Sequence, residues 1–117
     1  VTVVLIGAET WQRKHVDWEI GSSIRHTQYN PRSGLLGILL PSYPYPYPEP
    51  NKYNTYTIPP RLHDNIECGF ASIHSWSDDA ETVQGWIHEA YLRKSRVNPN
   101  NSHVSFGRNR TGDSWAE

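Results

Sequence analysis

A chain of 117 residues is long enough for one domain and too short for two of ordinary size. Its net charge of −1 excludes the basic surface typical of nucleic-acid-binding proteins, so we expect no nucleic-acid partner. No apolar run approaches the length of a membrane span, and a single cysteine, Cys68, excludes an internal disulfide, so we expect a cytoplasmic protein without a membrane partner.

The first predicted element is a strand at residues 2–6 (TVVLI), which Gly7 ends. Because the run is apolar at successive positions, it predicts a strand of a parallel sheet that is buried on both faces. Such a strand needs neighbours on both sides. We therefore expect either that the chain is the C-terminal part of a longer product or that a partner covers this strand. The alternative is that the start of the sequence is arbitrary.

A helix is predicted over residues 13–28, after a polar turn at residues 7–10 (GAET). Its apolar residues recur at helical spacing: Val16, Ile20 and Ile24. In α/β sheets, ligands bind where a strand's carboxyl end leads into the next helix, and Glu19 is the carboxylate that this helix brings to such a place. The alternative for Glu19 is a solvated carboxylate favoured by the helix dipole, which is also what we expect of Asp17.

The second predicted strand spans residues 35–40 (LLGILL). It follows a turn in which Pro31 disfavours helical backbone in the residue before it. Strand, helix and strand with short connections predict a parallel βαβ unit. Residues 41–60 are rich in proline, which alternates with tyrosine over 43–48 and favours extended polyproline II. We expect a surface connection there, and the alternative is a proline-rich docking segment.

The second half of the chain predicts a turn at residues 59–65, a third strand at 69–75 and a second long helix. Asp78, with Glu81 three residues later, has the capping-box spacing that begins a helix. The helix carries an apolar stripe that predicts a buried face: Val83, Trp86, Ile87, Ala90 and Tyr91.

These elements together predict an α/β fold, a parallel sheet with helices on both faces. After Val97 the sequence is polar and rich in helix breakers. We therefore expect one domain over residues 1–97 and a polar tail over residues 98–117.

Several stretches of the chain resemble one family. VTVVLIGAETWQRKHVDWEI is similar to the third strand and following helix of bacterial and archaeal TIR-like domains, relatives of which occur in Thoeris-type antiphage systems. GLLGILLP is similar to that family's next strand, and IPPRLHDNIECGFASIHSW with ETVQGWIHEAYLRK to its last strand and last helix. The resemblance implies a flavodoxin-like sheet of strand order 2-1-3-4-5, of which this chain would be the C-terminal portion without the first strands.

The family resemblance also implies an activity. Such proteins consume NAD, as NAD glycohydrolases or as ADP-ribosyl cyclases that make a cyclic ADP-ribose signal. NAD would be the substrate, with no bound cofactor, and we expect a homo-oligomer and an effector protein in the same defence system as partners. The alternatives are a non-catalytic TIR-like interaction module that works by assembly and a nucleotide-binding receiver without catalysis.

The resemblance assigns the catalytic role to Glu19 and a substrate-binding role to His15, which occupies the position, four residues earlier, at which the family has a tryptophan. Cleavage of the nicotinamide–ribose bond creates an oxocarbenium-like centre, which a carboxylate stabilises. Nicotinamide leaves as a neutral molecule, so no second acid is required.

The remaining substrate-binding candidates lie just before the first helix. Gly7, Glu9 and Thr10 belong to a loop whose backbone N–H groups could hold a phosphate or ribose. Trp11 could stack on a nicotinamide or adenine ring. The alternative for Trp11 is packing, which we favour for Trp18.

The nearest group of metal-binding residue types comprises His63, Asp64, Cys68 and His74. Its spacing matches no standard zinc pattern, so we expect no metal site. The apolar setting of Cys68 predicts a buried thiol.

Overall fold

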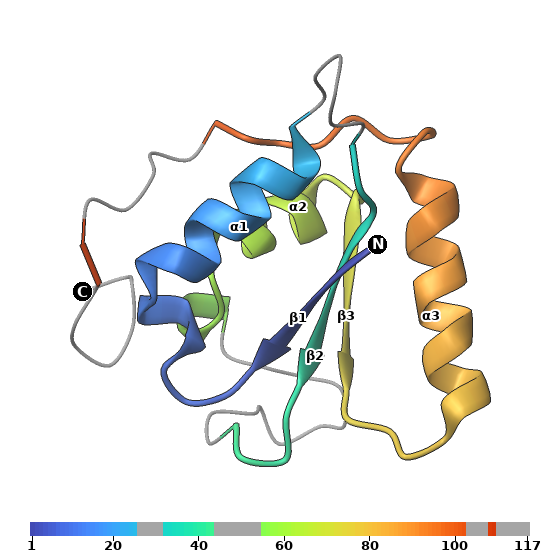
Figure 1. Ribbon diagram of the computed structural model, residues 1–117, viewed down its shortest axis with the longest axis horizontal. Coiled ribbons are helices and arrows are strands. Elements are labelled where there is room, and N and C mark those ends of the chain that lie inside the picture. Colours follow the sequence, from blue (N-terminus) through green and yellow to red (C-terminus); the bar gives the residue numbers. More distant parts are fainter. Residues whose placement is uncertain (26–31, 44–54, 103–107, 110–117) are drawn as a thin grey trace.

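The computed structural model describes residues 1–25, 32–43, 55–102 and 108–109. Its elements follow in the order β1 (Thr2–Ile6), η1 (Thr10–Gln12), α1 (Lys14–Ile24), β2 (Leu35–Leu39), η2 (Thr55–Thr57), α2 (Pro60–Glu67), β3 (Ala71–Ser75) and α3 (Ala80–Arg93). The three strands form one parallel sheet in the order β1-β2-β3 (Figure 1). The predicted α/β class and its three strands are confirmed.

The register of the sheet divides its side chains between two layers of helices. Val4 pairs with Gly37 and Ile38 pairs with His74, and successive side chains along each strand point to opposite faces. The larger core cluster, with Val4 and Leu35, lies on the face that α1 and α2 cover. A smaller cluster on the other face joins β2 to α3.

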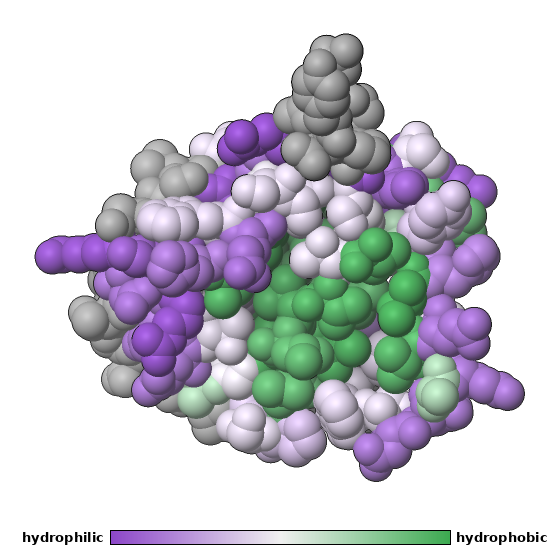
Figure 2. Space-filling model, viewed as in Figure 1, coloured by the Kyte–Doolittle hydropathy of each residue, from purple (hydrophilic) through white to green (hydrophobic). Residues whose placement is uncertain are grey.

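The three strands differ in how completely they are buried. All five residues of β2 are buried, as its apolar run predicts. In β1, however, Val3 is 36% exposed and Leu5 is 50% exposed, so the predicted burial of β1 on both faces is wrong. The reason is that β1 is an edge strand of this sheet, and α3 packs over β2 and β3 rather than over β1. Figure 2 shows the resulting apolar surface between α1 and α3.

The predicted turn at residues 59–65 is wrong, because residues 60–67 form the helix α2. Pro60 occupies the first turn of α2, where a missing N–H costs nothing. Arg61, Leu62 and Asn65 are buried on one side of α2. The buried face of α2 thus contains the charged Arg61 and the amide Asn65 in place of apolar residues. For this reason the sequence shows no apolar stripe at helical spacing over these residues.

The boundaries of the two long helices also differ from the prediction. Helix α1 ends at Ile24, since Arg25 is extended, and residues 26–31 lie outside the described part of the chain. Helix α3 is capped by Asp79 rather than by Asp78, because the carboxylate of Asp79 accepts the Glu81 N–H at 3.3 Å. The Asp78 carboxylate instead accepts the indole N–H of Trp76 at 2.9 Å.

Of the predicted stripe on α3, four members pack toward the sheet and one does not. Ala90 is buried, and Val83, Trp86 and Ile87 pack against it and β2. Tyr91 is exposed. Most of the proline-rich segment at residues 41–60 lies outside the described residues, but both of its described flanks contribute buried side chains to the core, from Tyr43 and Ile58.

Candidate functional site

Glu19 lies in the middle of α1, is exposed to solvent, and lines a groove together with residues of β1. The groove, of about 130 Å³, lies between these two elements. Its lining residues are Thr2, Val3, Val4 and Leu5 from β1, Thr10 from η1, and Val16, Glu19 and Ile20 from α1. Glu19 supplies the only charge among these residues, and no ion pair of the described residues involves its carboxylate. The groove therefore presents a free negative charge beside apolar side chains.

The size of the groove limits what it can hold. Pockets for whole drug-sized ligands span about 300–1,000 Å³, so a groove of about 130 Å³ suits one ring, such as a ribose, rather than a whole dinucleotide. A larger ligand bound at Glu19 would extend over the exposed surface around it.

The loop before α1 is closed on itself. The backbone N–H of Gly7 donates to the Thr10 hydroxyl at 2.9 Å, and the Glu9 carboxylate pairs with Arg13 at 3.0 Å. The Gly7 N–H is thus already bonded, and neither Gly7 nor Glu9 lines the groove. Of the loop candidates, Thr10 alone lines the groove together with Glu19.

The burial of the two tryptophans in this part of the chain is the reverse of what the sequence predicts. Trp11 is only 2% exposed, so its indole packs in the interior and has no free face for stacking. Trp18 is 41% exposed, and its predicted core packing is wrong because Asp17, Ile20, Gly21 and Ile24 occupy the inward face of α1. His15, one turn before Glu19, stands edge-on to the Trp18 ring with centroids 5.0 Å apart, and Lys14 Nζ lies 5.5 Å from that ring.

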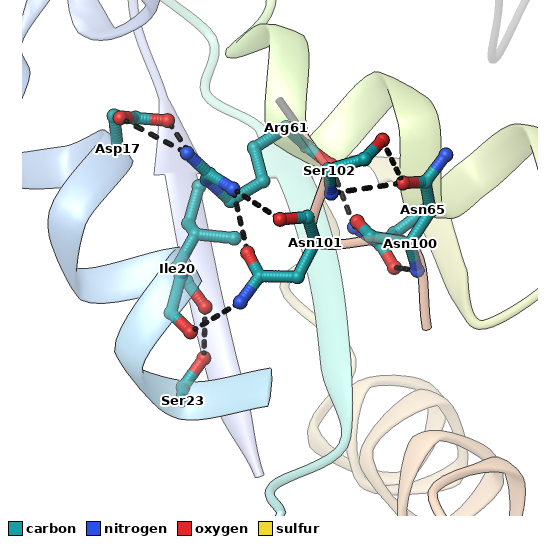
Figure 3. Close-up of polar contacts among 9 residues, drawn as sticks. Asp17, Ile20, Ser23, Arg61, Asn65, Asn100, Asn101 and Ser102 are labelled. Carbon is teal, nitrogen blue, oxygen red and sulfur yellow. Dashed lines mark hydrogen bonds and ion pairs between the residues drawn. The ribbon is translucent and has the colours of Figure 1, made fainter. Parts of the chain in front are cut away.

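A buried ion pair behind Glu19 was missed by the sequence reasoning. Asp17 is 1% exposed and Arg61 is 2% exposed, so the expectation that Asp17 is solvated is wrong. Arg61 Nε donates to Asp17 Oδ1 at 3.0 Å and Nη2 donates to Oδ2 at 3.5 Å (Figure 3). A signal did exist, since Asp17 precedes Ile20 and Ile24 at three and seven residues, on the same helical stripe.

The candidates for metal and thiol chemistry do not form a site in the described part of the chain. Among these residues, no three His, Cys, Asp or Glu side chains gather closely enough to hold a metal ion. Cys68 is exposed, not buried as its apolar neighbours in sequence predict, because α2 ends just before it.

The described helices include none with both the length and the apolar character to cross a membrane.

Comparison with known proteins bears on this groove. Residues 1–44 match the family model of the TIR-like domain of the Thoeris protein ThsB. The predicted TIR-like resemblance is confirmed over these residues, and that of the later strand and helix stays a prediction. The matching TIR-like segment contains β1, α1 and β2, and with them every residue that lines the groove. No curated protein and no solved structure matches the chain significantly.

Proposed function

We propose that this TIR-like protein cleaves the nicotinamide–ribose bond of NAD as part of an antiphage defence system. Water would add to the ribose carbon and lose a proton to give ADP-ribose, if the protein is a glycohydrolase, or another group of the same NAD molecule would add to it and close a cyclic ADP-ribose signal, if the protein is a cyclase. The observation that carries the proposal is the unneutralised carboxylate of Glu19 in a groove built entirely from the TIR-like segment. NAD is the substrate, and we propose no bound cofactor.

The chemistry follows from the charge in the groove. Departure of nicotinamide leaves positive charge on the ribose, and the Glu19 carboxylate would lie beside it in surroundings formed mainly by Val3, Val16 and Ile20. Glu19 is exposed in the free chain, so the attraction between the two charges would be strengthened by a bound substrate that displaces water from the carboxylate. The Thr10 hydroxyl lines the same groove; it already accepts the Gly7 N–H and donates to the Leu5 carbonyl at 3.4 Å, so toward a ribose hydroxyl it would act as an acceptor through its remaining lone pair.

Nicotinamide release from NAD tests the proposal. The measurement compares the unmodified chain at high concentration with Glu19→Gln and with Glu81→Gln, an exposed glutamate on α3. We expect Glu19→Gln to lower turnover at least about 100-fold, as loss of one electrostatic stabiliser does, and Glu81→Gln to leave it unchanged. Equal turnover in the three proteins would refute the assignment of Glu19.

A second candidate function is a non-catalytic assembly module. It is favoured by the apolar surface (Figure 2) to which Val3 and Leu5 of β1 and the preceding Val1 contribute exposed side chains. Unpaired edge strands readily pair with other chains, so we propose self-association under either function. Under either function we propose an effector protein of the same defence system as a further partner. We also propose that the protein acts in the cytoplasm. A folded, self-associating chain that releases no nicotinamide would favour this second function.

A further inference from the structure

Helix α1 is anchored at Asp17 and at Gly21, which lie two residues before and two residues after Glu19. Asp17 is held through its carboxylate and Gly21 through its backbone carbonyl. These residues are one helical turn apart, so they share the inward face of α1, while Glu19 points toward the groove. Two anchors one turn apart fix both the rotation of α1 about its axis and its position along that axis.

The first anchor comes from α2. The Arg61 guanidinium bonds both carboxylate oxygens of Asp17, in the forked geometry that only arginine offers. The same guanidinium passes close to Gly21, where an added Cβ would lie 3.4 Å from Arg61 Nε. Arg61 therefore lies directly against the inward face of α1 over a full turn.

The second anchor comes from the segment that follows α3. Asn101 accepts Arg61 Nη1 through its side-chain oxygen at 2.6 Å and donates its side-chain N–H to the Gly21 carbonyl at 3.3 Å (Figure 3). One amide thus joins α1 to α2 through its two ends. The backbone of Asn100 is held in turn by two bonds of 2.8 Å with the Asn65 side chain on α2.

The same part of the chain also reaches the beginning of α1. Helix α1 has no cap from its own N-cap side chain, that of Arg13. The Lys14 N–H instead donates to the side-chain oxygen of Asn109 at 3.1 Å. Residues from the predicted polar tail therefore contact α1 at its start and at its middle.

We propose that Arg61 and Asn101 are positioning residues for Glu19, holding α1 so that this carboxylate stays over the groove. The inference rests on the proposed NAD cleavage. Neither residue lines the groove, so each acts through Asp17 and Gly21 rather than by touching the substrate. Small displacements of a catalytic group cost turnover more than they cost substrate binding.

The test measures kcat and KM for nicotinamide release in Asn101→Ala and Arg61→Lys. The matched control is Arg93→Lys on α3, where Arg93 bonds the Phe70 carbonyl and the Ser72 hydroxyl and does not touch α1. We expect kcat to fall roughly tenfold in Asn101→Ala and in Arg61→Lys with KM within about twofold, and Arg93→Lys to keep the wild-type kcat even where its Tm falls equally. Unchanged kcat in the first two variants, or an equal loss of kcat in the control, would overturn the proposal.

Hydrogen exchange separates this proposal from the proposed function. In Asn101→Ala we expect faster exchange of the backbone amides of α1, with those of α3 unchanged. If the wild-type chain releases no nicotinamide, the proposed function fails, and exchange alone decides whether α1 is anchored. Unaltered exchange in α1 would then reject the anchoring as well.

Discussion

Asp17 carries its charge into the interface between α1 and α2, and the stability of that interface depends on Arg61 remaining opposite it. Removing one member of a buried ion pair leaves the other charge without compensation. We expect Asp17→Ala to lower the free energy of unfolding by about 3–5 kcal/mol, measured by urea denaturation. Replacing both members with apolar residues, as in Asp17→Leu with Arg61→Met, is expected to cost far less. A double variant as unstable as the single one would show that the charges themselves are needed.

The same residue shows what the sequence could and could not predict at this site. The sequence places Glu19 on α1 and places α1 after β1, because both follow from local periodicity. The helical spacing places Asp17 on the stripe of Ile20 and Ile24, but it does not show which residue pairs with the Asp17 carboxylate or that Trp18 is exposed. Those environments depend on residues that are distant in sequence. Arg61 of α2 bonds Asp17 across 44 positions, and Asn101 bonds Gly21 across 80 positions. A single helical pattern contains no information about such distant partners.

At the scale of elements, α3 approaches the backbone that precedes β2 very closely. An added Cβ on Gly34 would lie 2.4 Å from the Ala90 carbonyl oxygen, a backbone atom that cannot move independently of α3. We expect Gly34→Ala to cost roughly 1–3 kcal/mol in denaturant unfolding, the usual range for overpacking. Gly85→Ala, at a position inside α3, is the control, because no atom lies within 4 Å of the added Cβ. It should raise the free energy of unfolding by about 0.5–1 kcal/mol.

The contact between β3 and α3 should respond to pH through His74. Burial, and then the nearby Arg93 charge, lower the pKa of His74. Its ring stacks on Trp86 with centroids 4.1 Å apart, and its Nε2 is 2.9 Å from the Ser72 hydroxyl that also accepts from Arg93. Below the ordinary histidine pKa of about 6.5, the unfolded chain takes up a proton that the folded chain resists. His74 therefore lowers stability as the pH falls from about 6.5 through its lowered folded pKa.

Urea denaturation of the wild type and of His74→Phe at pH 7.5 and pH 5.5 measures this contribution. Phenylalanine keeps an aromatic ring against Trp86 and removes the titration. Because the other histidines are common to both proteins, the difference between their pH dependences isolates His74. We expect the wild type to lose more stability than the variant on acidification. The opposite order would mean that the protonated ring is favoured, for instance by Trp86 beneath it.

At the scale of the whole molecule, the fold class and its three parallel strands follow from the sequence, because β1 and β2 are short apolar runs ended by glycine or proline and β3 lies in a weak alternation of apolar and polar residues. The exposure of β1 does not follow from it. An apolar run on an edge strand and one in the centre of a sheet read alike, and only the positions of α1 and α3 distinguish β1 from β2. The sequence does not predict the helix α2 either, because its buried face includes the polar residues Arg61 and Asn65, and only their partners elsewhere in the fold explain their burial.

That exposed strand leads to the last prediction, which concerns self-association. Val1, Val3 and Leu5 place three apolar side chains on the surface beside an open strand edge. Leu5→Lys adds a charge to this surface, and pairing with a second chain would have to desolvate it. We expect the variant to remain monomeric at concentrations at which the wild type associates, as measured by sedimentation equilibrium. Since Leu5 is half exposed, its replacement should leave the folded monomer nearly as stable as before. Tyr91→Lys, at an equally exposed aromatic on α3, should associate like the wild type. If this control dissociates and Leu5→Lys does not, the contact between chains involves α3 instead of β1.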